Sequence, residues 1–291
     1  MKLYRLMFWA SRQLPPDAHR YVQSLVRAPM PAKSIRKSRN AVEETLGGAR
    51  CVWLDKENAA TGVMIYLHGG AYIAGPFWMH WQWLSLVTRR LGIAGVMVDY
   101  RLADKAPYPA AVDDALGAIG ALREAGVLKE GRWILGGDSA GGGLAAVVCK
   151  RLHDADPSTM PAALMLTAPW VDLTVSQPGI PETAKRDPML SVRNVTQAAG
   201  MYAAGRPLTE PDISPLYADP TGFPPTHLNV GTDDILVHEV RLYRDLLAKS
   251  GVPCEFMEIP GAIHDAPLFV NSEHAAAIIA AQLDFARRHL A

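Results

Sequence analysis

The stretch Gly137-Asp138-Ser139-Ala140-Gly141 decides how this chain folds, because it places a serine between two glycines at a fixed spacing. Before it, Arg132-Trp133-Ile134-Leu135-Gly136 forms a short apolar run that is typical of a buried strand. After it, residues 142–150 begin with glycines and continue as an apolar segment, which predicts a helix over 143–153. A strand, a tight turn and a helix therefore follow one another, with Ser139 at the turn.

A corner of this kind exposes the serine hydroxyl and points the free N–H groups of the helix N-terminus at the same place. The glycines two residues either side of Ser139 let the strand and helix backbones approach closely. Ser139 is therefore a candidate nucleophile, and the N–H of Ala140 is a candidate donor to an oxyanion. Because serine is a poor nucleophile at its free pKa, a general base must lie beside it.

Apolar strands alternate with helices along most of the chain, after a hairpin that turns at Gly47-Gly48. This alternation predicts an α/β fold, with a mostly parallel central sheet covered by helices on both faces. The expected strands are 42–46, 49–54, 63–67, 94–100, 133–135, 163–167, 226–230 and 255–259, and the expected helices are 16–28, 79–91, 110–125, 143–153, 191–204, 238–250 and 272–289.

The interval 175–222 breaks the alternation and is rich in proline. An insertion of this length between two core strands is usually a lid or binding region, although a purely structural excursion is the alternative. We expect it to form a helical cap with the N-terminal segment. The expected division is an N-terminal cap segment at 1–38, the first part of the core at 39–174, a cap insertion at 175–222 and the second part of the core at 223–291.

Composition limits the class of partner. The 291 residues are 49% hydrophobic, enough for one large core, and the 29 basic residues balance the 29 acidic ones. Without a basic surplus, no nucleic-acid partner is expected, and the substrate should be a small molecule. No apolar run reaches the length of a membrane span, so no stable membrane insertion is expected.

The cysteines and histidines give no sign of a metal. Cys51, Cys149 and Cys254 lie far apart, as expected for reduced thiols in a cytoplasmic protein. His238 and Glu239 are adjacent, but no third ligand has suitable spacing. We therefore expect no metal and no cofactor.

His264 is the candidate base. It lies in Pro260-Gly261-Ala262-Ile263-His264-Asp265, directly after the strand 255–259, at the sheet edge where a catalytic loop belongs. The other late histidines, His274 and His289, fall within the final helix. The alternative is a structural loop histidine, but strand, loop and chain order all favour catalysis.

Two neighbouring carboxylates are candidates for the acid. Asp233 and Asp234 follow the strand 226–230, in Gly231-Thr232-Asp233-Asp234-Ile235-Leu236. One of them would hold the imidazole tautomer and stabilise the imidazolium. Their position alone leaves both open.

Further oxyanion donors are expected in His68-Gly69-Gly70-Ala71, which follows the strand 63–67. With Ala140, the backbone N–H groups of Gly69 and Gly70 would form the oxyanion hole, whereas a plain glycine turn is the alternative. The aromatic residues that follow either line the substrate pocket or pack in the core, and the sequence leaves both open. They are Phe77, Trp78, Trp81 and Trp83.

Taken together, these motifs resemble the hormone-sensitive-lipase-like group of α/β-hydrolases, the bacterial family IV carboxylesterases. The H-G-G-G box of that group is matched by 68–71 and its G-D-S-A-G-G elbow by 137–142. The resemblance runs from about residue 45 to the end. Its G-x-x-D-x-L motif places the acid at Asp234, and its Pro-Gly motif places the base at His264. Other familial runs are 100–103, 107–114, 169–173 and 214–216.

The resemblance implies an α/β-hydrolase fold and a serine hydrolase that cleaves carboxylic esters through an acyl-enzyme. With the aromatic, capped pocket it favours short to medium acyl chains, and it suggests a homodimer through the edge strand near 255–259. The alternatives are a lactone or aryl-amide hydrolase on the same triad and a non-catalytic ligand receptor, a role that an intact triad disfavours.

Two residues depart from the family pattern. Ala71 stands where the third glycine of the box belongs, and Asp265 stands where the glycine of H-G-F belongs. Asp265 places a carboxylate beside the base, which would raise the pKa of His264 or simply face solvent. Ala71, Trp78 and Asp138 are the residues that we expect to line the substrate pocket.

Overall fold

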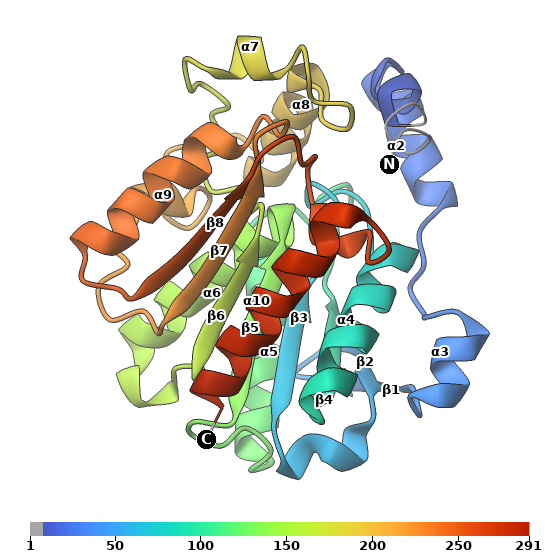
Figure 1. The fold of residues 1–291 in the computed structure, drawn as a ribbon, viewed down its shortest axis with the longest axis vertical. Helices are drawn as coiled ribbons and strands as arrows, with labels where there is room; N and C mark the ends of the chain where they lie inside the picture. The colour runs from blue at the N-terminus through green and yellow to red at the C-terminus, as the bar shows by residue number, and fades with distance from the viewer. Residues whose placement is uncertain (1–7, 291) are drawn as a thin grey trace.

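A single eight-stranded sheet organises the chain in the computed structural model, which describes residues 8–290. Its strand order is β1-β2-β4-β3-β5-β6-β7-β8 (Figure 1). The pairs β1–β2 and β2–β4 are antiparallel, and every pair from β4 to β8 is parallel. The strands are β1 (Val42–Leu46), β2 (Ala49–Leu54), β3 (Val63–Leu67), β4 (Ala94–Asp99), β5 (Trp133–Asp138), β6 (Ala163–Thr167), β7 (Thr226–Gly231) and β8 (Cys254–Ile259).

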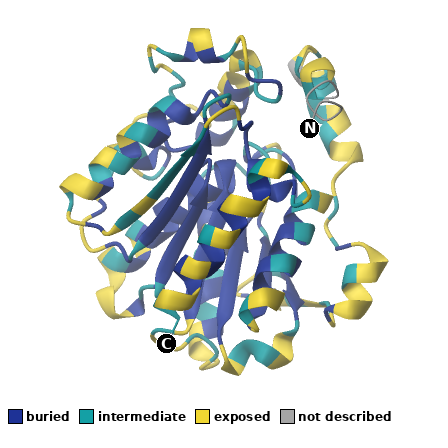
Figure 2. Cartoon of the chain, viewed as in Figure 1, coloured by how far each residue is buried: buried dark blue, intermediate teal, exposed yellow. Residues whose placement is uncertain are grey.

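The central strands are buried on both faces. All residues of β3, β5, β6 and β7 are buried, and Figure 2 shows them as a dark centre beneath partly exposed helices. This explains why their sequences are continuous apolar runs rather than alternating ones. β8 ends the order and is only partly buried, as expected for an edge strand.

Helices cover both faces of the sheet. On one face, α4 and α10 share a core cluster with side chains of β3 and β4, and on the other face α5, α6 and α9 do the same. The predicted fold class and layered architecture are therefore confirmed. Within residues 8–290, the helices of at least six residues are α2 (Pro16–Leu25), α3 (Lys33–Ser38), α4 (Trp78–Leu91), α5 (Ala110–Glu124), α6 (Ser139–Ala155), α8 (Val192–Ala203), α9 (Val237–Lys249) and α10 (Glu273–His289).

Three predictions of helix position were wrong or incomplete. The helix expected over 143–153 begins at Ser139, because glycines 141–143 lie inside the first turns of α6. The helix expected over 16–28 ends at Leu25, and α3 was not predicted. None of the residues of the short α3 is buried. Its sequence therefore lacks the apolar residues at helical spacing by which a helix is predicted.

The cap segments, which we define as residues 8–25 and 175–222, lie together at one end of the sheet (Figure 1). Arg12 joins them, donating to the carbonyl oxygens of Ala184 and Leu190 at 3.0 and 3.4 Å. In α8, Tyr202 stacks on Tyr72 with ring centroids 3.7 Å apart. Of the expected 1–38 cap segment, residues 1–7 lie outside the described part of the chain, and α3 lies beside α4, where Ile35 packs against the core.

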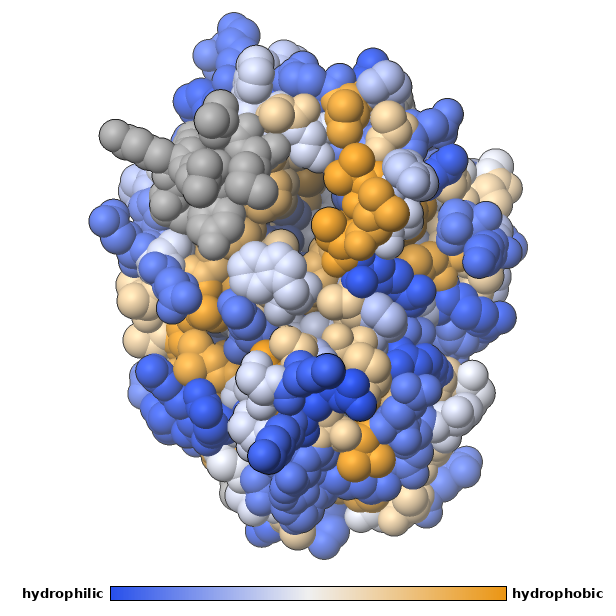
Figure 3. All heavy atoms as spheres, turned by 90° about the vertical axis from the view of Figure 1, so that its right-hand side faces the viewer, coloured by the Kyte–Doolittle hydropathy of each residue, from blue (hydrophilic) through white to orange (hydrophobic). Residues whose placement is uncertain are grey.

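The outer side of α2 leaves several apolar side chains in solvent. Tyr21, Leu25 and Val26 are 65%, 66% and 54% exposed. Figure 3 views the molecule from this side and shows apolar and polar surface side by side. Within residues 8–290, no helix has both the length and the apolar character needed to span a bilayer.

Candidate active site

Ser139 sits at a tight corner between β5 and α6. β5 ends at Asp138 and α6 begins with Ser139. The φ of Ser139 is +49°, a backbone conformation that residues other than glycine rarely adopt. The corner presses against the end of β3. A Cβ on Gly141 would lie 2.1 Å from the carbonyl oxygen of Leu67 and 2.5 Å from that of His68. Glycine is therefore required at 141 by close backbone approach.

We expect Gly141→Ala to destabilise the protein by about 3 kcal/mol or more, because neither backbone can yield without breaking the corner. Thermal unfolding followed by circular dichroism measures this. The matched control is Gly120→Ala in α5, where an added Cβ meets nothing within 4 Å. That control should gain up to about 1 kcal/mol from helix propensity. Equal effects of the two changes would contradict the packing described.

His264 and Asp234 form a buried pair. His264 lies on the loop after β8 and Asp234 on the loop after β7, and Nδ1 is 2.7 Å from Oδ2. Asp234 Oδ1 accepts a hydrogen bond from the N–H of Leu236 at 2.9 Å. Asp233, the other candidate acid, instead pairs with Arg186 at 3.4 Å. Of the two carboxylates, the structure brings Asp234 to the imidazole.

A second carboxylate faces the other ring nitrogen. Nε2 of His264 is 3.2 Å from Oδ2 of Asp265. Burial works to lower the pKa of His264, but the charges of Asp234 and then Asp265 outweigh it and raise the pKa to about 10. The hydroxyl of Ser139 makes no side-chain hydrogen bond within residues 8–290, so Asp265, not the serine, is the partner of Nε2.

The cap insertion is tied to the acid loop through Asp187. Its Oδ2 accepts the N–H of Ile235 at 2.9 Å, and its Oδ1 accepts those of Met189 and Leu190. Burial and then the charge of Asp234 raise the pKa of Asp187 to about 6. Sequence reasoning missed this residue. The only signal was an aspartate before a proline, which predicts a local turn and not a contact with a loop 48 residues away.

The loop after β3 supplies free N–H groups, of which that of Gly70 was predicted as a donor and that of Ala71 was not. The N–H of Gly69, predicted as an oxyanion donor, is engaged with Oδ1 of Asp138 at 3.0 Å. The N–H groups of Gly70 and Ala71 have no acceptor in the described part of the chain, nor has that of Ala140 in the first turn of α6. The available donors are therefore Gly70, Ala71 and Ala140.

Asp138 lies behind this loop rather than in a substrate pocket, so that expectation was wrong. It is completely buried and accepts hydrogen bonds from Tyr66 at 2.6 Å, Gly69 at 3.0 Å and His80 at 3.1 Å. Burial opposes its ionisation, but His80 and these hydrogen bonds lower the pKa of Asp138. Nδ1 of His80 accepts the N–H of Phe77, so Nε2 carries the proton that faces Asp138.

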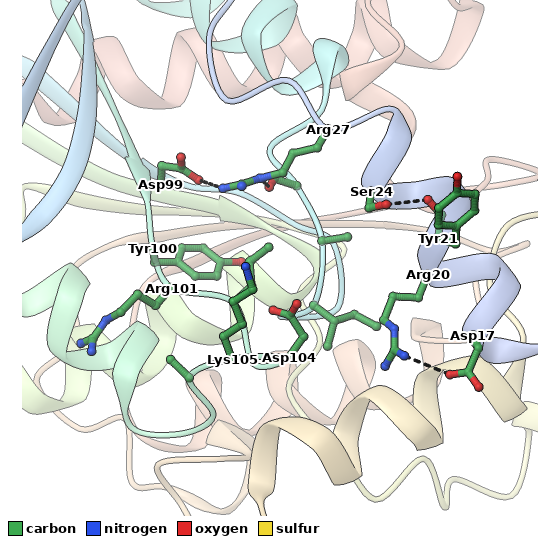
Figure 4. Close-up of a pocket in the computed structure, with 15 residues that line it drawn as sticks. Asp17, Arg20, Tyr21, Ser24, Arg27, Asp99, Tyr100, Arg101, Asp104 and Lys105 are labelled. Carbon is green, nitrogen blue, oxygen red and sulfur yellow. Dashed lines mark hydrogen bonds and ion pairs between the residues drawn. The ribbon is translucent and has the colours of Figure 1, made fainter.

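Two hollows flank α2. The larger, of about 900 Å³, lies between α2 and residues 99–106 (Figure 4). Its rim carries the Arg27–Asp99 ion pair at 2.6 Å. The smaller, of about 50 Å³, is lined by Ala71 together with residues of α2 and of the cap at 189–197. Both share Arg20 and Ile73, so they adjoin next to the loop after β3.

Two of the four aromatic residues after that loop pack in the core. Trp81 and Trp83 are each 1% exposed and donate to Ala28 and Gln282. Trp78 is 42% exposed and lines neither of these hollows, so its expected place in the pocket is not observed. Of the three predicted pocket residues, which are Ala71, Trp78 and Asp138, only Ala71 borders one of these two hollows.

Comparison with known proteins places this geometry among hydrolases. A family described as alpha/beta hydrolase fold matches residues 64–268. An acetyl-hydrolase of Streptomyces hygroscopicus is 33% identical over 220 residues, which cover 76% of this chain and 73% of that protein. An esterase of Acinetobacter venetianus is 30% identical over 226 residues, covering 77% and 74%.

Solved structures agree with these relatives. The crystal structure of an esterase from the bacterial hormone-sensitive lipase family superposes with a TM-score of 0.88 at 28% identity, covering 98% of this chain and 96% of the other. A hormone-sensitive lipase from a metagenome library superposes with a TM-score of 0.87 at 27% identity, covering 100% and 98%.

Proposed function

Because this chain belongs to the hormone-sensitive-lipase-like esterases of the α/β-hydrolase fold and hydrolyses small-molecule carboxylic esters, we propose that Ser139, His264 and Asp234 carry out that reaction. The observation that carries the proposal is the 2.7 Å contact between His264 Nδ1 and Asp234 Oδ2, on the loops after β8 and β7. The acid keeps the imidazole oriented and stabilises the imidazolium that forms.

In the first step, the Ser139 hydroxyl oxygen attacks the ester carbonyl carbon while Nε2 of His264 takes the hydroxyl proton. The carbonyl oxygen becomes an oxyanion, which the N–H groups of Gly70, Ala71 and Ala140 stabilise. Collapse of this intermediate breaks the carbon–oxygen bond of the ester. His264 returns its proton to the leaving alcohol, and the acyl group stays on Ser139.

In the second step, water attacks the acyl-enzyme with His264 again as the base. Collapse releases the carboxylic acid and gives the proton back to Ser139. Each cycle therefore consumes one ester and one water and returns every catalytic group to its starting state. No cofactor takes part in these steps.

We propose that the smaller hollow receives the acyl chain. Ala71 borders this hollow, and the N–H of Ala71 is one of the proposed oxyanion donors. The hollow has a volume of about 50 Å³, which leaves room for only a few water-sized groups. Its wall comes from α2 and the cap insertion, together with Ala71 and Ile73. This size supports short to medium acyl chains.

Hydrolysis of p-nitrophenyl esters from acetate to palmitate tests this proposal. We expect kcat/KM to be highest at short chains and to fall by about tenfold or more towards palmitate, because extra methylenes find no apolar contact. Ala71→Gly removes the methyl group that borders the hollow and should move the preference towards longer chains. A flat profile in both proteins would refute the role of this hollow.

The same panel, extended to lactones and aryl amides, tests the alternative activities. A lactone or amide turned over faster than every ester would replace the ester proposal while leaving the triad intact. The homodimer through β8 and the cytoplasmic location remain predictions. They are supported by the edge position of β8 and by three free cysteines.

A further inference from the structure

The environment of Nε2 of His264 differs from what the proposed mechanism requires. Nε2 must accept the proton of Ser139, yet Oδ2 of Asp265 lies 3.2 Å from it. Asp265 is only 7% exposed, and its backbone has a positive φ of +52°. We propose that Asp265 is a positioning residue that holds Nε2 of His264 in the resting enzyme and must release it before Ser139 is activated.

The inference holds for either position of the proton that His264 and Asp265 share. If Asp265 is ionised, it forms a close ion pair with an imidazolium whose Nε2 carries a proton. If Asp265 is the acid, its O–H lies beside the Nε2 lone pair of a neutral imidazole. In both arrangements the pair holds a proton that must leave before Nε2 can take the proton of Ser139.

The surroundings of Asp265 favour an extra proton in the cluster formed by His264, Asp265 and Asp138. Its carboxyl group also contacts that of Asp138, while no donor reaches its Oδ1 within the described residues. Burial raises the pKa of Asp265 well above its usual value, against the charge of His264, and Asp138 and Asp234 raise it further. Because Asp138 already accepts three hydrogen bonds that stabilise its charge, the extra proton belongs to the His264–Asp265 pair.

Other charged groups face the cluster from several elements. Asp234 and Asp187 act on His264 from the acid loop and the cap, and both favour its protonated form. Behind Asp138 lie Tyr66 of β3 and His80 of α4, whose protons are committed to Asp138. Asp234 would remain in a variant that lacks the Asp265 carboxylate, so only part of the effect on His264 belongs to Asp265.

Activation of His264 then requires the loss of one proton. The His264–Asp265 pair releases one proton to solvent, and the Asp265 carboxylate turns away from Nε2. A neutral imidazole remains, with Nδ1–H donating to Asp234 and the Nε2 lone pair available to Ser139. Because the charge of Asp265 favours the protonated imidazole, this release requires a higher pH than it would without Asp265.

The pH dependence of kcat/KM tests the inference. We would measure p-nitrophenyl acetate hydrolysis from about pH 5 to about pH 10 for the wild type, Asp265→Asn and Asp265→Gly. Asparagine and glycine both tolerate the positive φ at this position. We expect the ascending limb of both variants to lie about one pH unit or more below that of the wild type, since the opposite charge is lost. Below the limb, one unit corresponds to about tenfold higher activity.

Asp233→Asn is the matched control, because it removes a carboxylate next to Asp234 that pairs with Arg186 rather than with His264. Its limb should stay at the wild-type position. If the Asp265 limbs coincide with that of the wild type, Asp265 does not hold the base and the inference is overturned, whatever the absolute rates. An equal shift in Asp233→Asn would overturn it as well, by showing an unspecific charge effect.

The ring nitrogens of His264 give a second readout that needs no turnover. Their ¹⁵N shifts, assigned by the signal lost in His264→Gln, should titrate at higher pH in the wild type than in Asp265→Asn. A wild-type imidazole that is neutral with free Nε2 below pH 7 would overturn the inference even if both Asp265 variants failed to fold. The inference rests on His264 being the base, and that proposal fails separately if His264→Gln stays fully active.

Discussion

Replacing Ser139 with alanine should lower kcat by about five to six orders of magnitude, since the nucleophile is lost and only oxyanion binding and substrate positioning remain. The change removes one oxygen at a buried corner, so the fold should persist. The corner conformation at φ of +49° suits alanine no worse than serine. Hydrolysis of p-nitrophenyl acetate measures the loss, and thermal unfolding checks the fold.

Ser272→Ala is a matched control for this change. Ser272 is the N-cap of α10, where its hydroxyl accepts the N–H of Ala275 at 3.2 Å, and it lines neither hollow. It should cost about 1 kcal/mol of stability and leave the chemical step intact. Full activity in Ser139→Ala, with the fold unchanged, would remove Ser139 from the mechanism.

Replacing Asp234 with alanine should lower kcat by roughly 10⁴-fold, because Nδ1 of His264 loses its acceptor and the imidazole no longer keeps the required tautomer. Asp233→Ala should stay within about threefold of the wild type, because it loses a contact with Arg186 instead. Steady-state kinetics at saturating ester compare the two. A larger loss of kcat in Asp233→Ala would reverse the assignment.

The two aspartates also show how far the sequence could lead. Apolar runs and glycine turns were sufficient to predict strands such as β3 and β6, whose bounds agree with the structure, because buried parallel strands tolerate little else. Their position after β7 reduced the candidates for the acid of the triad to these two neighbouring aspartates. The loop geometry decides which of them contacts His264, and at the level of sequence only the family motif could choose Asp234.

The remaining features depend on contacts that no local pattern encodes. Asp138 was expected to line the substrate pocket, yet it holds the N–H of Gly69 and thereby changes which donors are free. Asp187 ties the cap to the acid loop across a long stretch of sequence. Asp265 was recognised as a departure from the family, but the sequence left open whether it faced solvent or Nε2, and only the structure brings its Oδ2 within 3.2 Å of that nitrogen.

Intact-protein mass spectrometry after reaction with a fluorophosphonate tests the central claim most directly. Such a reagent phosphonylates a serine only when a neighbouring base activates it. We predict one added phosphonyl group per chain, located on Ser139 by peptide mapping, with labelling lost in Ser139→Ala and strongly slowed in His264→Gln. Labelling at another residue, or full ester hydrolysis by an enzyme that takes up no label, would contradict the assignment of Ser139 as the activated nucleophile.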